Sequence, residues 1–245
     1  MAGNVIQFPT NRGDDRHPAL TIEKVLHEFC EEHSGSDKAK QDCERSVELF
    51  TNFLNDYAYL GLNEKDRQKL ERHENARGPK HKTFCQLFGP EQIPRNMDEF
   101  LHDFLISKVL CSQALLQSTA KMTERLCLWL QQKGYLSANE IKDAVRMAKK
   151  AAIQLPNAEK AAKLIWQESE AKYGQIEPDE SGHMRIERIE PGKLWLRPYQ
   201  GKYLGPVVVS EEISELLGVG WEINCGIKKH GKTWLLIEAI NIYPR

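Results

Sequence analysis

The sequence predicts an α+β protein in which an N-terminal all-α helical bundle is followed by a small C-terminal β-barrel-like domain. Up to Tyr173, apolar residues recur three and four positions apart, as on one face of an amphipathic helix. Beyond Met184 they form short β-branched and aromatic runs separated by Gly, Pro or charged turns, which is typical of strands. The stretch GQIEPDESGH between the two patterns predicts a linker. We therefore expect a flexible leader at 1–18, a helical bundle at 19–173, a linker at 174–183 and a small β-barrel domain at 184–245.

Composition and charge narrow the class of protein. The 245 residues are 40% hydrophobic and 28% charged, which is ordinary for a folded chain with a sizeable core. The formal net charge is −1, so any attraction to nucleic acid must come from local basic surfaces. No apolar run reaches the roughly 18 residues of a membrane helix, and the start of the chain lacks the features of a secretory signal. We expect a cytoplasmic protein with no membrane contact, and, because the six cysteines form no CxxC pair, no disulfide framework.

The strongest helical signal runs from Met97 to Ser137. It predicts two amphipathic helices that meet at Ser112, with a stop at Gly134. Each helix has one apolar stripe to bury: Met97, Phe100, Leu101, Phe104 and Leu105 in the first, and Leu115, Thr119, Met122, Leu126 and Trp129 in the second.

Further helices are expected on both sides of this pair. The apolar spacing predicts helices at 20–33 and 37–60, and the N-cap residue Asn63 predicts a solvated helix at 64–75 with little to bury besides Leu70. After Gly134, the run Ser137-Ala-Asn-Glu140 has the capping-box pattern of a helix start. We expect this helix to be interrupted at Pro156 and an Ala-rich helix to continue to about Tyr173.

The C-terminal domain is expected to close on itself. A short helix, SEEISELL, is expected among five strand-like runs that are separated by turns. The five runs are MRIERI, KLWLRP, YLGPVVV, WEINCGI and KTWLLIEAINIY. A sheet this small leaves its edges unpaired unless it forms a closed or half-closed barrel.

One string, GIKKHGKT from Gly226 to Thr233, matches the Walker A pattern of nucleotide-binding proteins. That chemistry needs a strand, a glycine loop and a helix whose N-terminus holds phosphates. Here the string lies between two strand-like runs, so it predicts a hairpin turn with Gly231 at positive φ. Lys228, Lys229 and Lys232 gather at the same turn, where they are either phosphate contacts or a solvated tip.

Catalytic and metal-binding patterns give no site. In HEFCEEH, His27, Cys30 and His33 cannot converge on one metal with Cys43, because positions i and i+6 of a helix face different sides. No nucleophile elbow and no HExxH motif occurs. The sequence therefore predicts no catalytic residue, no metal site and no cofactor, and hence no enzyme.

The most basic surface of the helical half lies in residues 64–83, which hold seven Lys or Arg against four Asp or Glu. Two interpretations stay open, a solvated charge run on a polar helix and a contact with a phosphate backbone. The candidates for the second are Arg72, Arg77, Lys80 and Lys82, with His73 and His81.

The run SQALLQSTAKMTERLCLWLQQKGYLS resembles the SAM-like core-binding segment of tyrosine recombinases and phage integrases. Ser112, Leu126, Trp129, Leu130 and Gly134 fall where that pattern has its Ser cap, its aromatic-Leu pair and its Gly turn. With VELFTNFLNDYAYLGL as a further helix of the same kind, the resemblance covers residues 38–137.

The same resemblance has departures. Leu115 stands where the family usually has Thr, and Thr119 where it often has Tyr. No His-x-x-Arg occurs in the chain, so the family's catalytic domain is missing and strand cleavage is not implied. What the resemblance implies is a helical unit that clamps duplex DNA, with Lys108, Lys121, Arg125 and Lys133 as phosphate contacts.

The barrel has a resemblance of its own. The run VVVSEEISELLGVGWEIN, which begins at Val207, is similar to the strand, helix, Gly, strand passage of SH3-like or OB-like barrels within residues 181–245. Such barrels often bind nucleic acid or peptides. The candidate surface for base stacking combines the cations Lys193, Arg197 and Lys202 with the aromatic residues Trp195, Tyr199 and Tyr203. The sequence leaves open whether these aromatic side chains are exposed or belong to the core.

The leading hypothesis is a bacterial-type, non-catalytic nucleic-acid-binding or adaptor protein whose partner is DNA or a single strand. The alternative is a protein-interaction module that forms a homodimer through the Ala-rich helices around Val145, or holds a protein partner on the barrel or on the Val5 to Phe8 island of the leader. Under the first hypothesis the nucleic-acid contacts are Arg72, Arg77, Lys80, Lys82, Lys121, Arg125, Lys228, Lys229 and Lys232.

Overall fold

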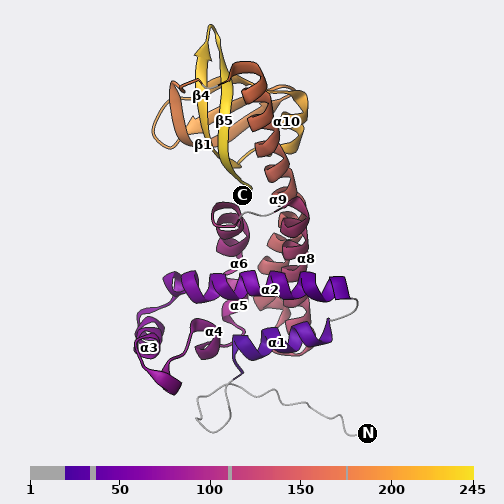
Figure 1. The fold of residues 1–245 in the computed structure, drawn as a ribbon, viewed down its shortest axis with the longest axis vertical. Coiled ribbons are helices and arrows are strands. Elements are labelled where there is room, and N and C mark those ends of the chain that lie inside the picture. The colour runs from indigo at the N-terminus through magenta and orange to yellow at the C-terminus, as the bar shows by residue number, and fades with distance from the viewer. Residues whose placement is uncertain (1–19, 34–36, 110–111, 175) are drawn as a thin grey trace.

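The computed structural model describes residues 20–33, 37–109, 112–174 and 176–245. Within these ranges, helices fill the chain up to Tyr173 and five strands follow. Figure 1 shows the helical bundle at one end of the molecule, the barrel at the other and one long helix, α9 (Ala138–Tyr173), running between them. The predicted α+β class, with bundle first and barrel second, is confirmed. The leader predicted at 1–18 lies outside the described residues.

The bundle combines three long helices with several short ones. Besides α9, its elements are α1 (Ile22–Glu32), α2 (Asp37–Tyr57), η1 (Ala58–Gly61), α3 (Glu64–Glu74), η2 (Gly78–Lys80), α4 (Phe84–Leu87), α5 (Gln92–Arg95), α6 (Met97–Glu99), η3 (Phe100–Phe104), α7 (Leu105–Ser107) and α8 (Gln113–Gln132). Of these, η3 is a π-helical turn that joins α6 and α7 into one continuous helical segment.

The helix pair predicted between Met97 and Ser137 is present, and its stripes face the core. The Ser112 side chain caps α8 by accepting a hydrogen bond from the Leu115 backbone N–H at 3.3 Å. Gly134 adopts a φ of 72°, which allows the chain to turn after α8. The residues predicted for the two stripes are buried, with Phe104 half-buried: Met97, Phe100, Leu101 and Leu105, then Leu115, Thr119, Met122, Leu126 and Trp129.

An aromatic cluster holds α2 against the helix that contains the π turn. The Phe53 ring centroid lies 5.3 Å from that of Phe100 and 5.3 Å from that of Phe104. Phe50 packs on Phe100 at 4.8 Å from the other side. Between α2 and α8, the buried Ser46 and Thr119 hydroxyls lie 3.2 Å apart. The Thr119 hydroxyl is therefore a hydrogen-bond partner for the buried Ser46 hydroxyl.

Helix α9 passes through Pro156 without a break, so the predicted interruption is wrong. Proline in a helix interior removes one backbone hydrogen bond and costs about 3 kcal/mol. Packing on both sides of the proline offsets this cost. Ile141, Ala148 and Leu155 belong to the bundle core, whereas Ala158, Ala161 and Ile165 belong to the barrel core.

The barrel closes with the strand order β1-β2-β3-β5-β4. Its neighbours are antiparallel except β3 and β5, which are parallel. Closure pairs the edges that an open sheet would leave exposed, as predicted. The elements are β1 (Glu180–Glu190), β2 (Lys193–Pro198), β3 (Leu204–Val208), α10 (Glu211–Leu216), β4 (Glu222–His230) and β5 (Thr233–Tyr243).

Two local features of the barrel bear on the sequence analysis. The Walker-like string forms the β4–β5 hairpin, with Gly231 at a φ of 58°, which confirms the predicted turn. Strand β1 begins at Glu180, inside the predicted linker, because residues 180–185 pair with residues 222–227 of β4. The pairing strand lies about 40 residues away, so the linker composition alone could not reveal it.

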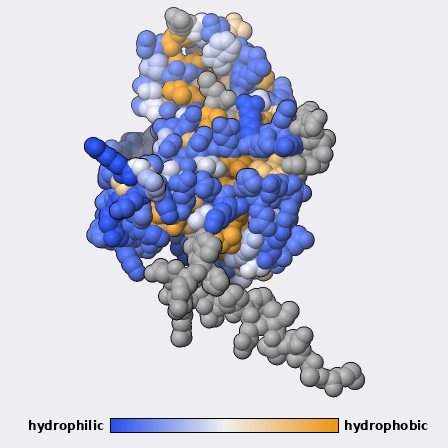
Figure 2. Space-filling view, turned by 60° about the horizontal axis from the view of Figure 1, so that its bottom comes forward, coloured by the Kyte–Doolittle hydropathy of each residue, from blue (hydrophilic) through white to orange (hydrophobic). Residues whose placement is uncertain are grey.

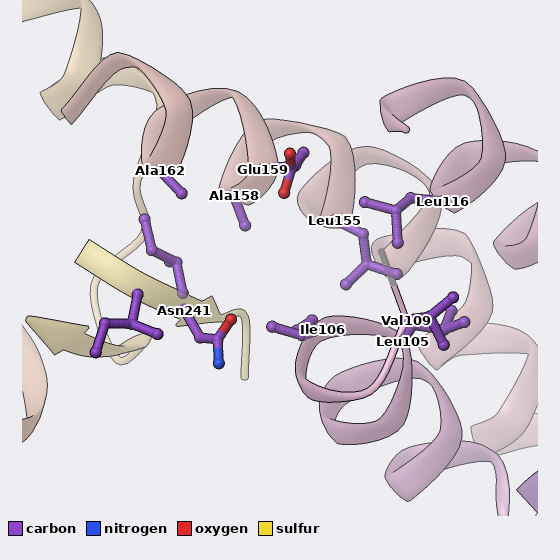
Figure 3. Close-up of a pocket in the computed structure, with 11 residues that line it drawn as sticks. Leu105, Ile106, Val109, Leu116, Leu155, Ala158, Glu159, Ala162 and Asn241 are labelled. Carbon is purple, nitrogen blue, oxygen red and sulfur yellow. The ribbon is translucent and has the colours of Figure 1, made fainter. Parts of the chain in front are cut away.

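Bundle and barrel meet at a seam beside α9. Arg245, which follows β5, places its Nη1 3.2 Å from Asp103 of η3 and its Nη2 3.7 Å from Glu222 of β4. Figure 3 shows the apolar part of the seam, where Ile106 of α7, Ala158 of α9 and Asn241 of β5 surround a small cavity of about 40 Å³. This volume suits a water-sized occupant, not an organic ligand.

The outer surface is mainly polar. On the face seen in Figure 2, hydrophobic side chains gather in separate patches between hydrophilic ones. Within the described ranges, no helix has the length and apolar character that crossing a lipid bilayer requires.

Replacing Phe53 by alanine should destabilise the bundle by about 3–5 kcal/mol, because it removes a side chain that is 1% exposed and leaves a cavity among aromatic rings. Urea denaturation followed by circular dichroism measures this change. Tyr59→Ala, at a position 43% exposed, is the matched control and should shift the free energy of unfolding by less than about 0.5 kcal/mol. Equal effects of the two changes would contradict the assignment of Phe53 to the core.

Candidate nucleic-acid interface

The outer face of β1 and β2 brings together cations and aromatic rings. Met184, Ile186, Leu194 and Leu196 point into the barrel and are at most 2% exposed, so the side chains between them point outward. Strand register then sets the outward residues opposite one another: Arg185 opposite Arg197, and Arg188 opposite Trp195. We call this surface, with the adjacent Tyr203, the barrel face.

Arginine side chains lie over two of the rings. The Arg188 guanidinium carbon is 3.6 Å from the Trp195 ring centroid, and that of Arg197 is 5.4 Å from the Tyr203 centroid. These distances are those of cation–π contacts. Behind Trp195, the backbone of Gly205 approaches so closely that a Cβ there would lie 2.5 Å from Trp195 Cδ1. Trp195 is therefore held by close contacts with the Gly205 backbone and the Arg188 guanidinium.

The charge on the barrel face is mainly positive. Arg188 pairs with Glu190 at 3.0 Å and Arg197 pairs with Glu187 at 3.3 Å. Arg185 is exposed and forms no ion pair with another described residue. Arg185 lies opposite Arg197 of β2 and opposite Glu222 of β4, so carboxylates next to both arginines offset the repulsion between them.

The loop between β2 and β3 adds accessible rings at the edge of the barrel face. Tyr199 is 72% exposed and Tyr203 is 47% exposed. A hydrogen bond with Glu222 raises the pKa of Tyr199 above its ordinary value, and this contact orients the ring. Lys202 in the same loop and Lys193 at the start of β2 are exposed cations.

The basic segment predicted in the bundle forms the end of α3 and the loop after it. Arg72, Arg77, Lys80 and Lys82 are all exposed. The two histidines lie within hydrogen-bonding distance of backbone carbonyls, with His73 Nδ1 3.0 Å from the Lys80 oxygen and His81 Nδ1 3.0 Å from the Glu74 oxygen. The histidines thus connect the loop to the helix, while the lysines and arginines point to solvent.

At the β4–β5 hairpin, only part of the predicted lysine cluster is available. Lys228 Nζ donates to the Glu177 carbonyl at 2.9 Å and to Asp179 at 3.2 Å. The Lys229 backbone N–H and then the Lys228 ammonium lower the pKa of Asp179. The Lys229 ammonium lies 4.6 Å from the Trp234 ring centroid. Lys229 and Lys232 are exposed without an ion pair among the described residues.

The cations implied by the recombinase resemblance lie in different settings. Lys121 and Arg125 are exposed on α8, and Lys108 is exposed after α7. Lys133, by contrast, is bound by two carboxylates of α1, at 3.0 Å from Glu28 and in close contact with Glu32. Its charge is already neutralised within the bundle.

The nine residues predicted as nucleic-acid contacts are not brought to one surface. Figure 1 places α3 at the bundle end of the long axis and the β4–β5 hairpin at the barrel end, so a short ligand cannot contact both. The barrel face uses Arg197, Trp195 and Tyr203, which the stacking hypothesis included, and adds Arg185 and Arg188, which it missed. The alternation of apolar and polar residues in MRIERI marks Arg185 as outward, but it would place Arg188 on the inner face with Met184 and Ile186. Arg188 faces outward because the strand register shifts between Ile186 and Arg188.

The cysteine and histidine side chains considered for a metal have other neighbours. Cys30 and Cys43 place their sulfur atoms 3.8 Å apart. His33 Nδ1 lies 2.9 Å from the Phe29 carbonyl, and His27 lies 3.5 Å from Glu31. Among the described residues, no three His, Cys, Asp or Glu side chains are placed to hold one ion.

Comparison of the chain with family models, with curated proteins and with solved structures gave no match.

The contacts of Lys133 predict a pH dependence of bundle stability. Hydrogen bonds from Lys133 and then Tyr135 lower the pKa of Glu28 below its usual 4.5, and Lys133 and then Trp129 do the same for Glu32. A lowered carboxylate pKa contributes stability above its unfolded-state value that is lost as the pH falls through the folded-state value. Lys133→Gln should therefore destabilise the protein at pH 7, and the difference from the unmodified protein should shrink below about pH 4.5.

Urea denaturation at pH 7, 5, 4 and 3 measures this difference. Lys142→Gln, an exposed lysine of α9 with no ion pair to another described residue, is the control and should leave the pH profile unchanged. A Lys133→Gln effect that stays constant from pH 7 to pH 3 would contradict the assignment.

Proposed function

We propose that this protein is a non-catalytic nucleic-acid-binding protein that binds single strands on the barrel face. The observation that carries the proposal is that Arg188 lies over Trp195 and Arg197 lies over Tyr203, on strands β1 and β2 and the loop that follows β2, with the exposed Arg185 beside them. Proteins that bind single strands combine a basic surface that follows the backbone with aromatic rings on which bases stack. Both components are present on the barrel face, within one sheet.

The strand order supports an OB-like assignment over an SH3-like one. Five strands close in the order 1-2-3-5-4, and α10 connects β3 to β4. OB-fold barrels bind oligonucleotides across the face of strands 2 and 3 and the loops between strands 1 and 2 and between strands 4 and 5. In this chain, β2 carries Trp195 and Arg197, and the β4–β5 loop carries Lys232. Tyr199 and Tyr203 lie in the loop between β2 and β3.

Single strands suit this surface better than a duplex. In a duplex the bases are stacked inside, and only their edges and the phosphates reach a protein. The exposed rings Tyr199 and Tyr203 offer flat faces, which unstacked bases can use. The bundle carries scattered cations such as Lys121 and Arg125, and in the proposal it serves as the adaptor part that duplex DNA or a protein contacts separately.

A second candidate function is a protein-interaction module, and α9 carries the observation that favours it. Trp166 and Ile153 are 60% and 66% exposed on this helix. Large apolar side chains at such exposure are candidate contacts with a protein partner or a second copy of the chain. Light scattering on the full chain separates the two: a concentration-dependent dimer that Trp166→Ala converts to a monomer supports this candidate, and a monomer at all concentrations contradicts it.

The nucleic-acid proposal predicts salt-dependent binding of a labelled strand of about 12 nucleotides, within the footprint range of OB folds. With three arginines as phosphate contacts, the slope of log K against log salt should be about −2. Tyr203→Ala should weaken binding by about 5- to 100-fold, because base stacking on one ring contributes about 1–3 kcal/mol. Fluorescence anisotropy at several salt concentrations gives both quantities.

Matched variants decide where the strand binds. Arg197→Gln on the barrel face should reduce both the affinity and the salt slope, whereas Lys121→Gln on α8 should change neither by more than about twofold. The proposal fails if the strand does not bind at low salt, or if the α8 variant weakens binding as much as Arg197→Gln does.

A further inference from the structure

A second cluster of cations lies where the bundle and the barrel meet, and Glu222 connects it to the barrel face by contacting both Arg245 and Tyr199. Three segments line one open cavity of about 340 Å³: the π-turn segment, the first half of α9 and Arg245 after β5. This volume lies at the lower end of the range for small-ligand sites, about 300–1,000 Å³. The polar lining residues are Asp98, His102, Arg146, Lys150, Gln154 and Arg245.

Helix α9 supplies one side of the cavity. Arg146, Lys150 and Gln154 recur every four residues and so share one face of the helix. Lys150 is exposed and forms no ion pair with another described residue. The Gln154 Oε1 atom is buried and accepts no hydrogen bond. A buried polar atom without a partner is unfavourable, and a ligand in the cavity satisfies it by donating a hydrogen bond once the amide turns toward the cavity.

The π turn supplies the opposite side. His102 is 6% exposed, and its Nδ1 lies 2.7 Å from Asp98. A carboxylate accepts hydrogen bonds, so this contact orients the imidazole with Nδ1 as the donor. π-helical turns are rare and often occur at functional sites. Here the turn at Phe100–Phe104 includes the one buried histidine among the cavity residues.

The third cation comes from the barrel side. Arg245 is held by Asp103 and Glu222, which fix the guanidinium at the seam. Arg146 is similarly paired with Asp143 at 2.8 Å. A guanidinium has five N–H donors, so each arginine keeps donors for a ligand after these pairs form. The lining thus holds three permanent cations and one carboxylate, Asp98, while Asp103, Asp143 and Glu222 pair with the two arginines from outside the lining. Lys150 is the lining cation without an ion pair among the described residues.

We propose that this cavity binds a phosphate group carried by a small ligand or by the end of a nucleic-acid strand. Arg146, Lys150 and Arg245 contact the phosphate oxygens, because guanidinium and ammonium groups at fixed positions are the protein groups that best match a multiply charged oxyanion. Gln154 accepts a hydrogen bond from a hydroxyl or amino group next to the phosphate. The site adjoins the barrel face through Glu222, but its lining residues differ from those proposed to bind a strand there.

Calorimetric titration of the full chain tests the site with three probes at one ionic strength: inorganic phosphate, a nucleoside 5′-monophosphate, and a short strand with or without a 5′-phosphate. At least one phosphate-bearing probe should bind. Lys150→Gln should weaken this binding about tenfold or more, since it removes a charge-assisted hydrogen bond. Lys142→Gln, two helical turns earlier on α9 and outside the cavity lining, should leave it within about twofold.

The probes distinguish the sources of the phosphate. Tighter binding of the monophosphate than of inorganic phosphate supports a small ligand with a neighbouring donor, and Gln154→Leu should then reduce that preference. Tighter binding of the 5′-phosphorylated strand than of its hydroxyl form, with the difference lost in Lys150→Gln and kept in Arg197→Gln, supports a strand end. The proposal is overturned if none of the probes binds at millimolar concentration, or if Lys142→Gln weakens binding as much as Lys150→Gln.

Discussion

The structure depends on one helix that is shared by two hydrophobic cores. The first half of α9 packs into the bundle through Ile141, Ala148 and Leu155, and the second half packs into the barrel through Ala158 and Ala161. Alanine allows close approach on both halves because it has no side chain beyond Cβ. At about 1.5 Å of rise per residue, the 36 residues span about 54 Å. Bundle and barrel therefore have a fixed separation, with Pro156 near the point where one core gives way to the other.

The basic residues fall into two groups: those whose ion pairs stabilise the fold, and those that remain available to a ligand. Lys133 and Lys228 are bound by carboxylates and stabilise the docking of α1 and the start of β1, respectively. Arg185 and Lys150 have no such partner among the described residues, and each lies beside another cation. A chain with a net charge of −1 can thus present positive surfaces, because its carboxylates pair with some of the basic side chains and leave others unpaired.

Much of the fold was predictable from local pattern. Helix stripes, the Ser112 and Ser137 caps, the Gly231 turn and the five strand-like runs follow from residue spacing within short windows. The continuity of α9 through Pro156 was not predictable, because the packing that offsets the proline comes from β strands far along the chain. The candidate sites were predictable only in part, for a related reason. Arg188 meets Trp195 through strand register, and His102, Lys150 and Arg245 meet through the placement of three distant segments.

The shared helix also determines how the chain can be divided. A cut after Tyr173 would leave Ala158, Ala161 and Ile165 without the barrel that covers them, and a cut before Ala138 would remove the helix on which α8 packs. A cut at Pro156 would give each part its own piece of helix but would end both pieces inside the seam. Pro156 is the boundary that keeps every buried α9 residue with its own core, because the bundle core ends at Leu155 and the barrel core begins at Ala158. Each part of this chain therefore needs its own half of α9 to complete its core.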